Sequence, residues 1–300
     1  MDASIPTQEG FVSFRGYHTW YRIAGKQETP HKLPLLCLHG GPGATHDYLL
    51  PIAALAEGGR CVVFYDQLGS GNSDPVRGKN LWTIDLFVDE LSTVCCSLGL
   101  ERVHILGHSW GGQLALEYAL RQPTGLASLI LADSLASSIQ WASEADLLRA
   151  ELPDDVQQTL RQHEADGTTS SPEYQEACKV YYRRHGCFLN PRPEWLQKAF
   201  EKIDSNQEVY QTMWGPSEFC VNGTLKDWDV TNRLGEIHVP TLVIGGRYDE
   251  ATPAITQAIH RGIPGSEWVI FENSAHFPHI DETEKYLHVL NTFLNRVEAQ

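Results

Sequence analysis

The sequence lacks the features that mark exported, membrane-spanning and nucleic-acid-binding proteins. No apolar stretch is long enough to cross a bilayer, and the first twenty residues hold no basic segment followed by an apolar one, so no secretory signal is expected. Basic residues are scarce, 23 against 38 acidic ones in a chain of 300. The formal net charge of −15 argues against nucleic acid or an anionic membrane as a partner.

Cysteine is sparse and irregularly placed. The seven cysteines, an odd number, form no CxxC motif and no Cys/His pattern suited to a metal. We therefore expect reduced, mostly buried thiols in a cytoplasmic protein, and no metal. Neither GxGxxG nor GK[ST] occurs, which argues against a glycine loop for phosphate. Repeats are also absent, and an apolar content of 42% is sufficient for a large core.

Strand and helix patterns alternate at both ends of the chain. The chain opens with a predicted hairpin at 11–14 and 18–24. Continuous apolar runs follow it, and such runs are typical of parallel strands that are covered on both faces. They lie at 33–39, 60–65, 103–106, 126–132, 239–245 and 268–271. Apolar residues recur at helical spacing over 81–98 and 286–297, which predicts two amphipathic helices.

The middle of the chain has a different pattern. No strand is indicated from about 134 to 232, and helices are expected at 141–165, 172–186 and 193–205. We therefore predict one mostly parallel, eight-stranded sheet flanked by helices and interrupted by a helical cap. The core would comprise residues 1–134 and 232–300, and the cap residues 135–231.

A serine stands at a sharp turn between a predicted strand and a predicted helix. Residues 107–111 read Gly-His-Ser-Trp-Gly and directly follow an apolar run. A nucleophile on such a strained turn needs glycines two positions to either side, because the helix packs close to the strand. This context makes Ser109 the candidate nucleophile.

A serine hydroxyl needs a base to take its proton and a third group to orient that base. Functional groups in an open parallel sheet gather at the carboxyl ends of the strands, and Asp249 and His276 each follow a late predicted strand. The order Ser109, Asp249, His276 is that of α/β-hydrolases, which predicts the α/β-hydrolase fold.

Other residues compete for these roles. His279, three positions beyond His276, is the main rival base, and Asp133 at a strand end is an alternative orienting acid. We expect His108 to pack with its ring turned away from the serine hydroxyl, and Glu272 to form a salt bridge or cap a helix.

Residues 39–43 read His-Gly-Gly-Pro-Gly after a predicted strand, similar to an HGGG-type oxyanion loop. Backbone N–H groups at Gly41 and at Trp110, directly after the nucleophile, are the expected donors to a developing oxyanion. The alternative is a plain turn, which such a glycine-rich segment would form in any case.

Together these motifs resemble the proline iminopeptidase family, α/β-hydrolase aminopeptidases with amidase relatives. The likeness covers nearly the whole chain, and its motifs lie at residues 39–43, 65–74, 107–112, 209–219, 223–229 and 246–253. The resemblance implies that Glu218 and Glu250 hold the free α-amine of a substrate, with Tyr210 near the same pocket. Trp214 is a candidate for lining the pocket of the first side chain, with core packing as the alternative.

The sequence thus predicts a serine hydrolase that needs no cofactor and releases an unblocked N-terminal residue from small peptides or amino-acid amides. Proline is one candidate for that residue, and the reaction would pass through an acyl-enzyme. One alternative is an esterase, lactonase or tailoring hydrolase of small-molecule biosynthesis with the same triad. Another is a non-catalytic, ligand-binding homologue.

Overall fold

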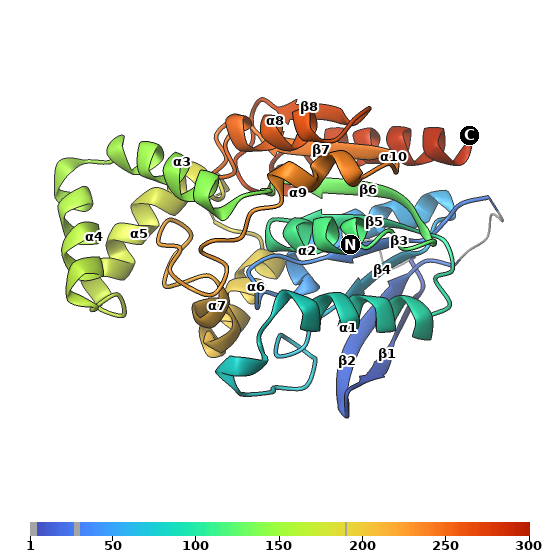
Figure 1. Ribbon diagram of the computed structural model, residues 1–300, viewed down its shortest axis with the longest axis horizontal. Helices are drawn as coiled ribbons and strands as arrows, with labels where there is room; N and C mark the ends of the chain where they lie inside the picture. Colours follow the sequence, from blue (N-terminus) through green and yellow to red (C-terminus); the bar gives the residue numbers. More distant parts are fainter. Residues whose placement is uncertain (1–4, 27–30, 190) are drawn as a thin grey trace.

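The computed structural model describes residues 5–26, 31–189 and 191–300. Its centre is an eight-stranded sheet with the strand order β1-β2-β4-β3-β5-β6-β7-β8 (Figure 1). The strands are β1 Thr7–Phe14, β2 Tyr17–Ala24, β3 Leu35–Leu38, β4 Val62–Tyr65, β5 Val103–His108, β6 Leu126–Ala132, β7 Thr241–Gly246 and β8 Glu267–Phe271. The pairs β1–β2 and β2–β4 are antiparallel and the others parallel, which confirms the predicted sheet.

Residues next to each other on the central strands enter cores on opposite faces of the sheet. On β3, Leu36 and Leu38 join an apolar cluster with α1 (Ile84–Ser97) and α2 (Trp110–Leu120). Leu35 and Cys37 join a second cluster, with α10 (Thr283–Glu298). Because both faces are covered, the inner strands are continuously apolar rather than alternating.

Several shorter or peripheral helices complete the core. The segment η1, His46–Gly58, is a 3-10 helix that the sequence reading did not predict, and it contains Pro51. The others are η2 Lys79–Leu81, η3 Thr231–Glu236, α8 Pro253–Gly262 and α9 Pro278–Asp281.

The cap segment contains no strand among its described residues, 135–189 and 191–231. Its helices are α3 Ser138–Ala150, α4 Asp154–Asp166, α5 Pro172–His185, α6 Glu194–Ser205 and α7 Glu208–Met213, of which α3, α4 and α5 extend beyond one end of the sheet (Figure 1). The single helix predicted over 141–165 is wrong. Pro153 separates α3 from α4, because a proline inside a helix removes an N–H donor and clashes with the preceding turn.

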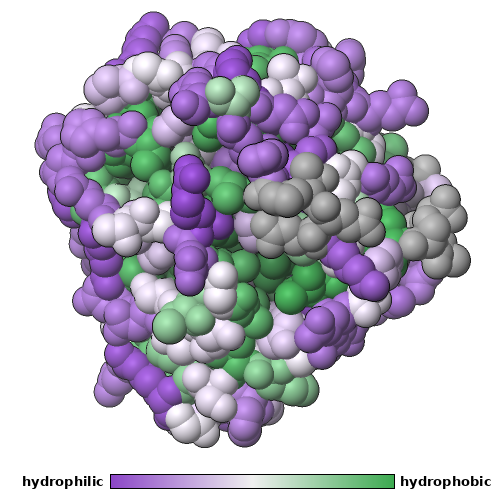
Figure 2. Space-filling view, turned by 90° about the vertical axis from the view of Figure 1, so that its right-hand side faces the viewer, coloured by the Kyte–Doolittle hydropathy of each residue, from purple (hydrophilic) through white to green (hydrophobic). Residues whose placement is uncertain are grey.

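The cap and the core share one apolar cluster, which joins Trp141, Tyr181 and Trp214 to the sheet residues. The division at residues 134 and 232 therefore stays a prediction. The end of the molecule away from the cap is mostly hydrophilic, with smaller hydrophobic areas between the polar side chains (Figure 2). No helix in the described ranges is long and apolar enough to cross a membrane.

Candidate active site

Ser109 stands between β5 and α2 with φ +55° and ψ −123°, a conformation that non-glycine residues rarely adopt. Close packing holds this turn in place. A Cβ on Gly107 would overlap the carbonyl of Gly111, and one on Gly111 would overlap the carbonyl of Leu38 on β3. The two glycines that the motif requires are therefore needed for steric reasons.

Asp249 and His276 meet at the same edge of the sheet, on the segments that follow β7 and β8. Their Oδ1 and Nδ1 atoms are 2.6 Å apart, and Oδ1 also accepts a hydrogen bond from the N–H of Ala251 at 2.9 Å. A proton on Nδ1 directed at Asp249 leaves Nε2 free to act as a base.

The cap also contacts this pair, because the N–H of His276 donates to the carbonyl of Gly186, just after α5, at 2.9 Å. Ser109 and His276 line one cavity, and within the described ranges no hydrogen bond joins the hydroxyl to Nε2. Catalytic hydrogen bonds of this kind often form only once a substrate is bound.

The rival residues lie in other environments. The Nε2–H group of His279 donates to the carbonyl of Tyr48 at 3.1 Å rather than to Asp249, and burial lowers the pKa of His279 to about 3. Glu272 forms an exposed ion pair with Arg247 at 2.6 Å, as predicted. Asp133 is fully buried beside Asp249, and among the described residues no hydrogen bond joins it to His276.

His108 is turned away from the Ser109 hydroxyl and belongs to a buried chain of hydrogen bonds. Its Nε2 is 2.8 Å from the carbonyl of His276, so this nitrogen carries the proton. Its Nδ1 is then an acceptor for the Tyr48 hydroxyl at 3.0 Å, which itself accepts from the N–H of Gly40 at 2.7 Å. Burial holds the pKa of His108 well below its usual range, so the imidazole is neutral.

This series of hydrogen bonds links the glycine loop at residues 39–43 to the backbone of His276, the predicted base. Sequence reasoning missed Tyr48, because it lies in η1 without any motif around it, and only the fold brings it to Gly40 and His108. Gly40 packs against the serine turn: a Cβ there would lie 3.0 Å from the Cβ of Ser109. The loop that carries Gly41 is thereby fixed next to the nucleophile.

The backbone and the side chain of Trp110 lie in different surroundings. Trp110 is the first residue of α2 and directly follows Ser109, so its backbone N–H lies where an oxyanion donor is expected. Its indole is buried, donates to Gln67 Oε1 at 2.8 Å and does not line the cavity within the described ranges. Gly41 does line the cavity, with φ +109°.

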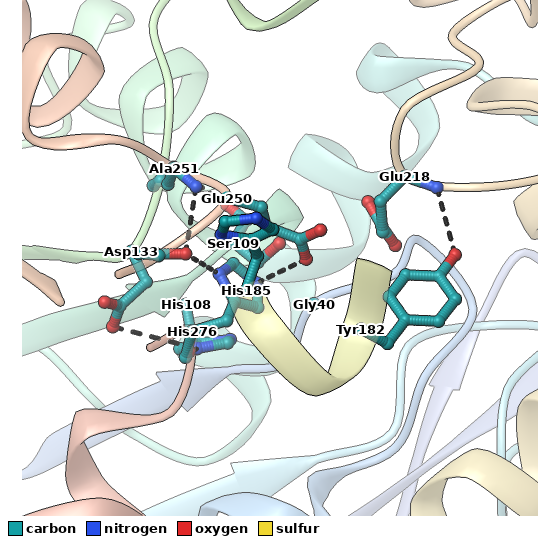
Figure 3. A network of polar contacts seen from close by, with 12 residues as sticks. Gly40, His108, Ser109, Asp133, Tyr182, His185, Glu218, Glu250, Ala251 and His276 are labelled. Atoms are coloured by element: carbon teal, nitrogen blue, oxygen red, sulfur yellow. Dashed lines mark hydrogen bonds and ion pairs between the residues drawn. The ribbon is translucent and has the colours of Figure 1, made fainter. Parts of the chain in front are cut away.

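Glu218 and Glu250 both line the cavity, and their carboxyl groups point into the space between them (Figure 3). Glu218 accepts a hydrogen bond from the Tyr210 hydroxyl at 2.7 Å. Glu250 Oε2 is buried without a partner, and its Oε1 is 3.8 Å from His276 Nε2. Two carboxyl groups so arranged form a site for a group with several N–H donors.

Burial governs the protonation of this acidic pair. It raises the pKa of Glu218 to about 7, against the opposing effects of the Tyr210 hydrogen bond and of His276. Burial, followed by repulsion from Glu218 and Asp249, raises the pKa of Glu250 well above its usual range. A bound cation would offset both penalties, because an opposite charge favours the ionised carboxylate.

Aromatic side chains hold the backbone of Glu218. The indole N–H groups of Trp141 and Trp214 donate to its carbonyl at 2.7 and 3.4 Å, and its own N–H donates to the Tyr182 hydroxyl at 3.3 Å. Trp214 is buried behind Glu218 and does not line the cavity in the described part of the chain, in contrast to Tyr210. The structure therefore gives Trp214 a place in the core, the alternative left open by the sequence.

The cavity has a volume of about 300 Å³ and extends past the reacting groups to the cap. On that side it is lined by the apolar residues Leu196, Ala199, Phe200 and Ile203 of α6. Lys179, Arg192 and Asp204 add charged groups to the lining. The cavity lining thus combines an acidic pair of residues with an apolar surface from α6.

The sheet order, the serine turn and the adjoining Asp–His pair define an α/β hydrolase. The family model of the alpha/beta hydrolase fold matches residues 34–283. The chain is 40% identical to a proline iminopeptidase of Saccharolobus solfataricus, over 98% of this chain and 94% of that protein. It belongs to the proline iminopeptidase family.

Solved structures agree with this assignment. The crystal structure of a proline iminopeptidase from Mycobacterium smegmatis is 42% identical with a TM-score of 0.90, covering 97% of this chain and 99% of that one. The crystal structure of VinJ is 44% identical with a TM-score of 0.94 and the same coverage. Esterases and lactonases with this fold are only 19–23% identical, a likeness that concerns the fold alone.

Proposed function

We propose that this chain is a serine aminopeptidase or amidase, which cleaves the amide bond after an unblocked N-terminal residue. The observation that carries this proposal is the pair of carboxyl groups, Glu218 and Glu250, in the cavity that also contains Ser109 and His276. A primary or secondary ammonium supplies the charge and the N–H donors that this pair lacks. Membership of the proline iminopeptidase family supports proline as one accepted first residue.

The reaction follows the usual course of a serine hydrolase. Nε2 of His276 takes the hydroxyl proton as Ser109 Oγ attacks the carbonyl carbon, while Asp249 orients the imidazole. The N–H groups of Gly41 and Trp110 bind the oxyanion. As the C–N bond breaks, His276 returns the proton to the leaving nitrogen. Water, activated by the same base, then hydrolyses the acyl-enzyme and releases the first residue.

Binding of the amine positions the reacting bond. With the ammonium between Glu218 and Glu250, only the first carbonyl of the substrate reaches Ser109, which restricts cleavage to one residue. The leaving group is then directed to the apolar part of the cavity along α6. The cytoplasmic location expected from the sequence, the absence of a cofactor and the small-molecule nature of the substrate are part of the same proposal.

Three substrates test the proposal: an aminoacyl arylamide, its N-acetylated form, and a short acyl ester without an amine. We expect kcat/KM for the free amine to exceed that for the N-acetylated form by at least 100-fold, because blocking removes the charge-assisted hydrogen bonds. Equal rates on the first two would contradict an amine anchor. Preference for the short ester over an aminoacyl ester of the same alcohol would favour the esterase alternative.

A further inference from the structure

Asp133 is a buried acid that the proposed mechanism does not use. It directly follows β6, between the strands that lead to Ser109 and to Asp249, and is fully buried with φ +52°. Its Oδ1 accepts a hydrogen bond from the N–H of Gly246 at 3.1 Å, while its Oδ2 has no hydrogen-bond partner. Nε2 of His108 lies 3.8 Å from this Oδ2 and already donates to the carbonyl of His276.

Asp249 also has a carboxylate oxygen without a hydrogen-bond partner in the described part of the chain. Its Oδ1 accepts from both His276 and Ala251, and its Oδ2 is buried without a partner. The two carboxyl groups lie at the carboxyl ends of the neighbouring strands β6 and β7, and Asp249 is one of the charges that act on Asp133. Burying two ionised carboxylates with unpartnered oxygens would cost folding free energy. If one of the two groups is protonated, its O–H can donate a hydrogen bond to the free oxygen of the other, so that both oxygens have a partner.

The surroundings of Asp133 offer no compensating positive charge. His108 from β5 is neutral, and the other titratable groups that face Asp133 are Asp249, Asp281 on α9, Tyr48 on η1 and Tyr286 on α10. Within the described ranges no lysine or arginine pairs with it. Burial first, and the neighbouring Asp249 second, raise the pKa of Asp133 well above its usual range.

We propose that Asp133 is a neutral carboxylic acid that donates a hydrogen bond from Oδ2 to Oδ2 of Asp249, and so acts as a positioning residue for the Asp249–His276 pair. This inference rests on the proposed catalytic role of that pair. The hydrogen bond fixes the rotation of the Asp249 carboxylate, so that Oδ1 stays directed at Nδ1 of His276. It also leaves a single negative charge, rather than two, next to the base.

Asp133→Asn is the matched test, because an amide keeps a donor at this position and asparagine tolerates a positive φ. The activity is measured on a short acyl ester, so that amine binding does not enter the result. We expect kcat within about threefold of wild type and an unchanged acidic midpoint of the pH profile, since a neutral group replaces a neutral group. If Asp133 were ionised, its loss would move that midpoint down by about one pH unit or more, which would overturn the proposal.

Asp133→Ala removes the donor. We expect kcat to fall about tenfold or more with KM little changed, because Asp249 Oδ2 is left unpartnered. Wild-type kcat in this variant would refute the positioning role. A readout without turnover uses protein labelled with ¹³C in its aspartate carboxyl groups: the infrared spectrum at neutral pH should contain a protonated-acid band that Asp133→Asn lacks. Identical spectra would overturn the proposal, whether or not the enzyme cleaves peptides.

Discussion

Oε1 of Glu250 lies 3.8 Å from Nε2 of His276, so one carboxyl group faces both the predicted base and the space proposed for the substrate amine. Glu218 has a different position, held by Tyr210 and Tyr182 of the cap. The two acids of the proposed amine site are therefore not equivalent, and their loss should have different kinetic consequences.

Glu218→Gln should raise KM for free-amine substrates about 10- to 100-fold with a smaller effect on kcat, since it removes a charge-assisted hydrogen bond to the ground state. Glu250→Gln should lower kcat as well, because this group also faces the base. Steady-state kinetics on the arylamide and the short ester separate these effects. A similar loss on the ester in Glu218→Gln would show that this residue supports the fold rather than the amine.

The pH dependence of amine binding follows from the pKa of Glu218, which is raised to about 7. Below that value the carboxyl group is protonated and cannot pair with an ammonium, so KM should fall as the pH rises through about 7. A free α-amine loses its own proton near pH 8, so KM should rise again there. The ester should show no such optimum in KM, and a flat KM for the amine between pH 5 and 9 would contradict this account.

Ser109→Ala should abolish turnover of all three substrates, by a factor on the order of 10⁴ or more, because no other group can form the acyl-enzyme. The variant should keep the wild-type circular dichroism spectrum and still bind a free-amine substrate, which calorimetry would measure. Residual activity near wild type would exclude Ser109 as the nucleophile.

The role of the Tyr48 hydroxyl can be tested by removing it and, as a control, by removing the hydroxyl of a second buried tyrosine. Tyr48→Phe leaves the N–H of Gly40 and Nδ1 of His108 without their partner, and we expect kcat to fall about tenfold as the oxyanion loop loses its support. Tyr286→Phe is the control, because that hydroxyl is buried without a hydrogen-bond partner and its removal should leave kcat unchanged. Equal effects of the two substitutions would argue for packing alone.

Strong local patterns made much of this fold predictable, and long-range geometry limited the rest. The parallel strands were predicted because they are continuously apolar, and Ser109 because its flanking glycines are sterically required. Tyr48 and the direction of the Trp214 side chain were not predictable, since each depends on contacts between segments far apart in the chain. The break at Pro153 was visible locally, but the helical spacing on both sides of it obscured the boundary.

The apolar side of the cavity predicts a preference for the leaving group. Phe200 on α6 lines this side, with the guanidinium of Arg192 4.8 Å from the centre of its ring. Phe200→Ser should lower kcat/KM for arylamides about five- to tenfold, because the contact with an apolar leaving group is lost. A primary amide of the same amino acid releases only ammonia, does not reach α6, and should react as in wild type.

Leu147→Ser is the control for this cap substitution, because Leu147 lies on α3 and is 61% exposed. It should leave both substrates unaffected. A loss in Phe200→Ser that is equal for arylamide and primary amide would mean that Phe200 holds the cap in place rather than contacting the leaving group. A selective loss would instead place the bond to be cleaved between the acidic pair and α6, because Glu218 and Glu250 would hold one part of the substrate and α6 the other.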